Sequence, residues 1–581
     1  MKSWWKRVLP CSMLPTVWFN WDDDYSPTGD PFHRKEVRTL CEATEGLVRV
    51  PIDKCTSRML FVCPSRFQQL YTQTFPVSSD TVRYRNTGMS IQEALAYLKV
   101  EHQRFTKFGR FNNQGDIPMP YLLPKLKDVV ADCKTVFEKK GVCCRCRPIV
   151  PFTKHPMKPS YRRGAKGLGK VVQSIPDGQH FGIWKSSQVR ERFDQWMCEA
   201  RTRYGAGNFK WLLLVGDLAN MYDELDHSGI DPASLEALKQ YSSWVGRRST
   251  SVRGLTINMV TMEVIDGKRY LDHDVYFLFE ELFELSQFDN THCWLQFRDR
   301  VFERRLGVPM GGLLSPHKAN LVLGHREKWF LELLSLLGLT GGGIRFMDDV
   351  GLAIAYSTDD ELRLARAWCD FVCGSMGYPH PLVLEMEPEN SSYEYLEMII
   401  STTGDQLRTC FHNKFVTNLN AGNCYFVRYP SGCDSMTQEE RIQYVTAHLY
   451  RIFACTMTSE DLVGSLAELC IEVIASAWPM RLVKTALFKQ LDHPTFGDEK
   501  YSEEMRSGIV KFLEAVNCMP WVVKFVRLFN CLICPLINFR MPWHALPHLR
   551  ADLRSTSCAD EGDVERHRMK RTHTARSPII Q

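Results

Sequence analysis

The chain has 581 residues, of which 44% are hydrophobic and 24% are charged, so it can bury a sizeable core in several subdomains. No apolar run reaches the ~20 residues that a membrane span needs, which argues against a helical membrane protein. The 21 cysteines are odd in number and irregularly spaced, which favours free thiols in a reducing compartment over disulfides or a zinc site.

The net charge is only +5, but it is unevenly distributed. Residues 101–170 contain 16 Lys and Arg against 5 Asp and Glu, a net charge of +11, which leaves −6 for the remainder. A basic segment in a near-neutral chain indicates a polyanionic partner. Cationic residues recur every four positions from Lys154 to Lys170, yet prolines and glycines interrupt them, so we predict a mobile basic loop suited to phosphates.

The helical segments are recognised by apolar residues at intervals of three and four. The first follows a serine cap, the second ends at a glycine, the third follows a glycine turn, and the fourth begins with acidic residues. These helices are expected at 90–105, 186–205, 311–338 and 358–377, and a helical pattern returns over 435–540.

Strands are indicated by apolar runs and by period-two alternation. The sequence "FKWLLLV" (209–215) reads as a buried strand, residues 293–308 as a hairpin, and residues 382–416 as short strands. The stretch "GIRFMDDVGLAIAY" (343–356) alternates on both sides of two acids, which predicts strand, tight turn and strand.

Three acidic residues follow or interrupt these strands. Asp217 comes after the buried strand with only Gly216 between them, and Asp348 and Asp349 occupy the predicted turn. Carboxylates in such places are costly unless a cation neutralises them. We therefore expect the three to converge around two Mg²⁺ ions, which Mn²⁺ could replace, because such a pair can clamp an in-line phosphoryl displacement.

The order of these segments is similar to that of reverse transcriptases. "GDLANMYDEL" resembles their first palm motif, with Asp217 as a metal ligand and Tyr222 as the aromatic residue that excludes a ribose 2′-hydroxyl. "GVPMGGLLSPHKANLVL" resembles the second, in which Met310 and Gly311 belong to a turn that contacts template and incoming nucleotide. "FMDD" matches the catalytic box of an aromatic residue, any residue and two acids.

The flanking segments extend the resemblance to residues 117–416. "MPYLLPKLKD" and "RCRPIVPFTK" resemble two finger strands, which would offer Lys125 and Arg147 to the triphosphate. The segment "LVLEMEPENSSYEYLEMIISTTGDQLRTCFHNKF" looks like a primer grip, and its pattern is closest to Penelope-like retroelements and telomerase. Two alternatives remain open, namely that Arg147 forms a structural ion pair and that Tyr222 packs in the core.

The resemblance implies an α+β fold, a right-hand polymerase with fingers, a palm made of an antiparallel sheet packed on helices, and a helical thumb. The backbone carbonyl of Leu218 would add a metal ligand. The expected divisions are an N-terminal region of unknown role, basic fingers, a palm with an insertion at about 228–290, a thumb, and a disordered charged tail. Their bounds are 1–95, 96–210, 211–416, 417–545 and 546–581.

The function implied by the resemblance is that of an RNA-directed DNA polymerase of retroelement type. Its partners would be an RNA template, a DNA primer and deoxynucleoside triphosphates, without a membrane, and it would act inside the cell, in the nucleus. The basic stretch "RHRMKRTHTAR" (566–576) agrees with nuclear action. The alternatives are an RNA-dependent RNA polymerase with the same palm, or a decayed or domesticated protein that only binds nucleic acid.

Overall fold

The computed structural model describes residues 44–53, 55–75, 83–125, 144–246, 253–414, 436–475 and 481–491, with a few isolated residues up to 512. In these residues helices and strands are mixed, and every ladder between named strands is antiparallel. The predicted α+β class is therefore confirmed. None of the helices in the described residues is both long and apolar enough to cross a membrane.

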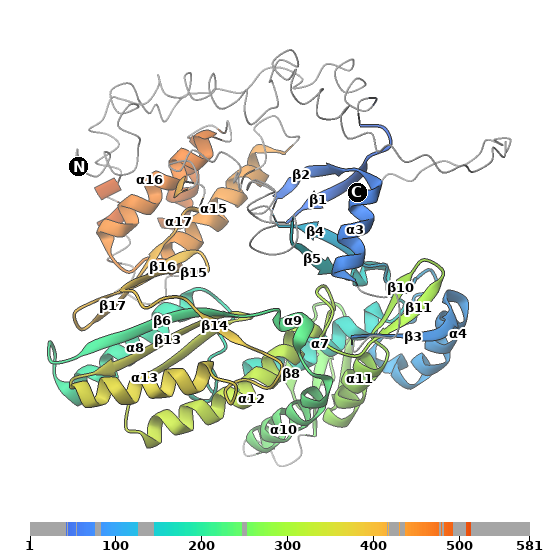
Figure 1. Cartoon of the computed structure of the whole chain (residues 1–581), viewed down its shortest axis with the longest axis horizontal. Helices are drawn as coiled ribbons and strands as arrows, with labels where there is room; N and C mark the ends of the chain where they lie inside the picture. The colour runs from blue at the N-terminus through green and yellow to red at the C-terminus, as the bar shows by residue number, and fades with distance from the viewer. Residues whose placement is uncertain are drawn as a thin grey trace, which may run out of the picture.

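A four-stranded sheet, here called the central sheet, lies in the left half of the view in Figure 1. Its strand order is β12-β13-β6-β14, so the strand nearest the N-terminus lies between two later ones. The predicted hairpin is present, because β12 and β13 are joined by the two-residue turn Met347–Asp348. The strands are β6 (Lys210–Leu218), β12 (Thr340–Phe346), β13 (Asp349–Tyr356) and β14 (Leu384–Met386).

Both faces of the central sheet are buried, because its apolar residues alternate between two clusters. Leu212 and Leu352 point into the cluster that contains residues of α12 (Ser315–Leu336) and α13 (Asp359–Cys373). Leu213 and Val215 point into the opposite cluster, which contains residues of α8 (Ser187–Tyr204) and of the segments that follow the central sheet.

The segments after β14 form a three-stranded sheet and a group of helices on that second face (Figure 1). The short strands predicted over 382–416 are thus present, and the helical pattern is confirmed as far as residue 491. The remainder of 492–545 and the tail at 546–581 lie outside the described residues apart from isolated positions. The elements are β15 (Ser392–Tyr395), β16 (Met398–Thr403), β17 (Gln406–Phe411), α15 (Gln438–Cys455), α16 (Ser459–Ala475) and α17 (Arg481–Leu491).

The predicted helix boundaries follow from local capping chemistry. Ser90 and Glu93 form a reciprocal capping box at the start of α4 (Ile91–Glu101). Thr358 accepts a hydrogen bond from the Glu361 backbone N–H at the start of α13. Helix α8 ends at Gly205, whose φ of 82° is the left-handed conformation that stops a helix.

The prediction of a mobile basic loop over 154–170 is wrong, because residues 158–173 form helix α7 (Lys158–Gln173). Pro159 lies in the first turn, where a missing N–H is tolerated. Gly164 and Gly167 face Leu285 and Leu282 of α11 so closely that a Cβ would lie 2.6 and 2.8 Å from the leucine side chains. Tertiary packing therefore overrides the low helix propensity of these glycines.

The segment predicted as an insertion, at about 228–290, forms a small α/β unit that packs on α12 and α7. Lys318 of α12 is buried and ion-paired with Asp289, and it donates a 2.7 Å hydrogen bond to Asn290. The hairpin predicted over 293–308 follows this unit in the chain and pairs with β3 (Tyr84–Ser90). The elements are α10 (His227–Gly246), β7 (Gly254–Asn258), β8 (Val264–Asp266), β9 (Asp274–Leu278), α11 (Phe279–Thr291), β10 (Trp294–Phe297) and β11 (Arg300–Arg304).

Part of the N-terminal region lies beside the two predicted finger strands. β4 (Tyr121–Pro124) pairs with β5 (Cys146–Ile149), and the Asp53 backbone N–H donates to the Pro124 carbonyl at 3.0 Å. Asp53 directly follows β1 (Val48–Ile52), which pairs with β2 (Cys55–Val62) before α3 (Pro64–Thr74). Figure 1 shows these strands and α3 together at one side of the molecule.

Strand β12 contains three consecutive glycines, and aromatic side chains lie directly on two of them, Trp196 on Gly342 and Phe181 on Gly343. A Cβ on Gly343 would lie 2.4–2.6 Å from ring atoms of Phe181, which is fully buried and cannot move aside. We expect Gly343→Ala to lower the free energy of unfolding by about 1–3 kcal/mol through overpacking. Urea unfolding measures this. Gly178→Ala is the control, because a Cβ there would meet no atom within 4 Å, and equal stability of the two variants would contradict the packing.

Candidate active site

Asp217 and Asp349 lie directly opposite each other on neighbouring strands of the central sheet. The Leu218 N–H donates to the Asp348 carbonyl at 2.8 Å, which makes Asp217 and Asp349 a non-hydrogen-bonded pair. In such a pair the Cα atoms are roughly 4.5 Å apart and both side chains leave the same face of the sheet. The structure thus brings Asp217 to the hairpin that carries Asp348 and Asp349.

The acids lie where the apolar row on this face ends. Trp211, Leu213 and Val215 are buried in the second cluster, and the next side chain on the same face is that of Asp217, which is exposed. Asp348 is also exposed and Asp349 is half-buried. Core packing therefore does not close off the carboxylates from a ligand.

A fourth acid joins this row, and the sequence reasoning did not identify it as a site residue. Glu385 of β14 pairs with Asp217 on the side opposite Asp349, and its side chain is exposed. Glu385, Asp217 and Asp349 therefore occupy one face of three adjacent strands. The only sequence signal was the alternation in "LVLEME", which does not reveal the partner strand.

The carboxylates at this edge suit a divalent cation in chemical type, but they are not gathered around one point. Within the described part of the chain, no three His, Cys, Asp or Glu side chains are already gathered closely enough to hold a metal ion. Like-charged carboxylates lower their energy by pointing apart when no cation is bound. Their oxygen atoms are nevertheless the hard ligands that Mg²⁺ prefers, and the register places them on one exposed edge.

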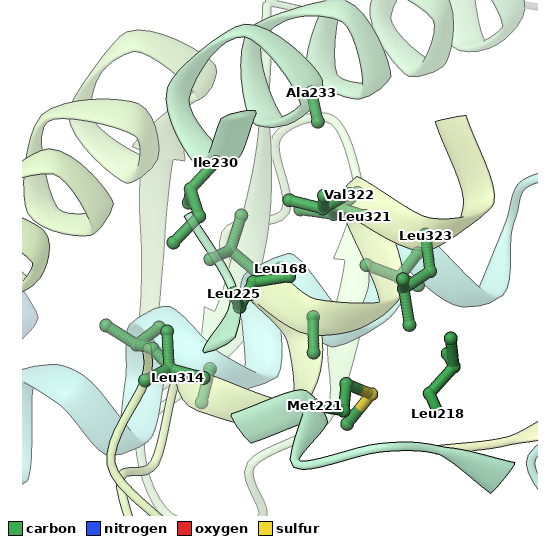
Figure 2. Packing of buried hydrophobic residues seen from close by; sticks show 14 of the residues in the cluster. Leu168, Leu218, Met221, Leu225, Ile230, Ala233, Leu314, Leu321, Val322 and Leu323 are labelled. Carbon is green, nitrogen blue, oxygen red and sulfur yellow. The ribbon is translucent and has the colours of Figure 1, made fainter. Parts of the chain in front are cut away.

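The side chain of Leu218, unlike those of the acids, lies in the hydrophobic core. Its side chain is buried, and Figure 2 shows it with Met221 beside residues of α12 such as Leu323. Its N–H forms the hydrogen bond to Asp348 described above, while the proposed metal contact of its carbonyl stays a prediction. The strand end that carries Asp217 is thus anchored in the core by the next residue.

A buried ion pair between β12 and α12 supports the hairpin turn. Arg345 and Glu327 are both fully buried, and the Arg345 guanidinium contacts both carboxylate oxygens of Glu327. Arg345 also donates to the Met347 carbonyl at 3.1 Å and to the Asn320 side chain at 2.8 Å. Helix α12 therefore fixes the residue that immediately precedes the two hairpin acids.

Glu327 is held in its charged form by the groups around it. Burial acts to raise its pKa, but Arg345 and the N–H of Phe181 outweigh burial and lower the pKa below its usual value. The Phe181 N–H and the Tyr378 hydroxyl donate to the carboxylate at 2.9 and 3.0 Å. A buried charge pair with this many hydrogen bonds is strongly destabilising to break.

Tyr222 lies against the hairpin that carries the acids. It belongs to α9 (Met221–Glu224), and its hydroxyl donates to the Met347 sulfur at 3.5 Å. Burial raises its pKa to about 12, and the nearby Asp348 acts in the same direction. The hydroxyl is therefore protonated at neutral pH, and the ring is half-buried rather than enclosed in the core.

The short helix α9, which carries Tyr222, is held by a second buried arginine. Arg304 of β11 is fully buried and donates to the Asp223 carboxylate at 2.6 Å and to the Tyr222 carbonyl at 3.2 Å. The Val308 N–H donates to the same carbonyl at 2.7 Å. The end of β11 and the residues that follow it thus position the short helix after β6.

Met310 and Gly311 connect the glycine turn before α12 to the finger strands. The Val150 N–H donates to the Met310 carbonyl at 2.8 Å, directly after β5. Gly311 has a φ of 101°, and a Cβ there would lie 2.5 Å from the Val150 carbonyl oxygen. Only glycine fits this conformation and this approach.

Lys125 directly follows β4, and Arg147 lies on β5 opposite Leu123. The Lys125 N–H donates to the Arg145 carbonyl at 2.9 Å, and Lys125 forms a backbone bridge with Asp53. The Arg147 guanidinium is 2.8 Å from the Asp53 carboxylate. The structural ion pair considered for Arg147 is thus present, and the phosphate contacts of both residues stay predictions.

No protein-family model and no curated protein sequence matches the chain. Among solved structures it is similar to telomerase from Candida albicans in complex with a TWJ fragment of telomeric RNA. The identity is 11%, the TM-score is 0.48, and the match covers 90% of this chain and 76% of that one. Apo telomerase from Candida tropicalis gives 10% identity and a TM-score of 0.45, covering 89% and 78% of the two chains. The BmCPV RNA-dependent RNA polymerase gives 11% and 0.30, covering 72% and 31%. Similarity at this level does not by itself assign an activity.

Removing the charge of Glu327 tests the support beneath the hairpin. We expect Glu327→Gln to lower the free energy of unfolding by about 3–5 kcal/mol, because Arg345 would remain buried without a counter-charge. Chemical denaturation of the purified protein measures the change. Glu332→Gln, at an exposed position of the same helix, should leave the stability unaltered. Equal stability of both variants and the unmodified protein would show that the pair does not support the fold.

Proposed function

We propose that this protein is an RNA-directed DNA polymerase that extends a primer 3′-hydroxyl by two-metal nucleotidyl transfer. The observation that carries the proposal is the pairing of Asp217 with Asp349 at an exposed sheet edge, with Asp348 in the adjoining turn. Asp217 is 131 positions from Asp348 along the chain, and only a shared sheet brings the two segments together. The motif order across 117–416 supports the same reading.

In this proposal Asp217, Asp348 and Asp349 hold two Mg²⁺ ions, which would lower the pKa of the primer hydroxyl and neutralise the departing pyrophosphate. The chain itself supplies the orientation. The β6–β13 register sets the spacing of the carboxylates, and the Arg345–Glu327 pair holds the turn. Glu385 adds negative charge beside Asp217, so the site attracts cations before any nucleotide arrives.

Tyr222 supports the use of deoxynucleotides. Its ring packs beside the hairpin, and its hydroxyl donates a hydrogen bond to the Met347 sulfur. A bulky ring held at this place would meet a 2′-hydroxyl on a nucleotide positioned at the acids. This reading favours a DNA product over the RNA product of the alternative polymerase.

Lys125 and Arg147 are proposed to neutralise the triphosphate from the finger strands. The link between Val150 and Met310 places these strands beside the glycine turn of the proposed nucleotide site. To bind the triphosphate, Arg147 would contact a phosphate in addition to, or in place of, the Asp53 carboxylate. The planar guanidinium group favours such a contact, because it can donate two parallel hydrogen bonds to a phosphate.

The proposed template is RNA and the proposed primer is DNA, as in retroelement and telomerase-type enzymes of the Penelope-like branch. Helix α7 supports a polyanionic partner, because Arg162 and Lys166 are exposed on it, four residues apart. The opposite face of the helix is buried against α11 and α12. Nuclear action is part of the same proposal.

Substitution of a hairpin acid tests the reaction. Asp348→Asn should lower Mg²⁺-dependent deoxynucleotide incorporation on a primed RNA template by at least about a thousand-fold, because several kcal/mol of transition-state stabilisation are lost. The thermal transition should be unchanged. Asp299→Asn is the matched control, since Asp299 is an exposed acid in the two-residue turn of the β10–β11 hairpin. Extension retained by Asp348→Asn, or absent from the unmodified protein, would reject the proposal.

Substitution of the aromatic residue tests the choice of sugar. Tyr222→Ala should raise ribonucleotide incorporation relative to deoxynucleotide incorporation by about ten- to a hundred-fold, because a steric block of a few kcal/mol is removed. Tyr222→Phe keeps the ring and should keep the discrimination. Single-nucleotide extension with each sugar provides the comparison. A preference for ribonucleotides in the unmodified protein would favour the RNA-dependent RNA polymerase instead.

A further inference from the structure

A tyrosine from outside the central sheet contacts the backbone of the hairpin that carries the acids. Tyr395, the last residue of β15, is 1% exposed, and its hydroxyl donates to the Asp349 carbonyl at 3.2 Å. Asp349 directly follows the two-residue turn, so this side chain contacts the backbone at one end of the turn.

The hydroxyl is held in place by the strands on which Tyr395 sits. Tyr395 pairs with Met398 across the β15–β16 hairpin, and both side chains are buried in the second cluster. Its position is therefore fixed by packing and not by the hydrogen bond alone.

The neighbouring tyrosine on the same face has a different role. Tyr393 is also buried, but its hydroxyl donates to the Pro388 carbonyl at 3.1 Å and accepts from the Asn390 N–H at 2.5 Å. Those contacts close the loop before β15. The two residues thus share strand, face and burial, and they differ in whether the hydroxyl reaches the acid-bearing hairpin.

We propose that Tyr395 is a positioning residue, which acts through the Asp349 backbone to hold the carboxylates ready for metal ions. This inference rests on the proposed function and adds to it a residue that touches neither substrate nor metal. Groups behind a metal ligand restrict its orientation, and their removal weakens metal affinity by about 10- to 100-fold. The β15–β17 sheet would thereby set how tightly the site holds its ions.

The test compares Tyr395→Phe with Tyr393→Phe in the full chain. Mn²⁺ binding to the protein without nucleic acid is followed by electron paramagnetic resonance, and the Mg²⁺ concentration for half-maximal primer extension is measured in parallel. We expect Tyr395→Phe to weaken Mn²⁺ binding about ten-fold and to raise the half-saturating Mg²⁺ concentration similarly. Tyr393→Phe should leave both unchanged, although it removes more hydrogen bonds. Thermal transitions of both variants show whether either has lost its fold.

Unchanged Mn²⁺ affinity in Tyr395→Phe would overturn the inference, as would an equal loss in the two variants, which would indicate a general structural effect. Asp217→Asn identifies the signal from this site, and the absence of any Asp217-dependent Mn²⁺ binding in the unmodified protein would also overturn it. Failure of the proposed function is distinguishable. If Mn²⁺ binding depends on Asp217 and is weakened by Tyr395→Phe, but the protein extends no primer, the positioning role stands and the polymerase assignment fails.

Discussion

The register between β6 and β13 is the constraint on which the site depends. Side chains alternate along a strand, so a shift by one residue would move Asp217 to the opposite face and away from Asp349. The acids repel each other, and nothing in their own interaction favours this arrangement without a cation. The apolar residues of the same strands, buried on both faces, stabilise it instead.

The hairpin turn is stabilised separately from the sheet. Met347, at the first turn position, has a φ of 59°, which is uncommon for a side chain with a Cβ. Its carbonyl accepts from Arg345, its sulfur accepts from Tyr222, and the flanking backbone contacts Tyr395. Three elements thus restrain the turn, namely α12 through its ion pair with Arg345, α9 through Tyr222, and the β15–β17 sheet through Tyr395. Such restraint is what a site needs when its ligands must not rearrange during a reaction.

Peripheral elements reach the site through backbone contacts and buried charges. Arg304 of β11 holds the α9 segment that carries Tyr222, and Val150 joins β5 to the Met310 turn. Lys318 ties the insertion to α12. Each of these links joins segments far apart in sequence, so segments that carry no acid still contribute to the placement of the acids. The reaction proposed here would use that shared framework, with Glu385 supplying further negative charge.

The local structure can be predicted from the amino-acid sequence, because period-two alternation and capping residues act over a few positions. The hairpin around Asp348, the buried strand before Asp217, and the start of α4 at Ser90 were all predictable in this way. The remaining features depend on contacts between segments that are distant in the chain. Helix α7 forms against local propensity because its glycines fit the leucines of α11. The ion pair of Arg147 with Asp53, the placement of Glu385 beside Asp217, and the reach of Tyr395 to Asp349 depend on which distant strands lie side by side. Strand pairing over long sequence separations is set by the total burial of both faces, and no short motif encodes it.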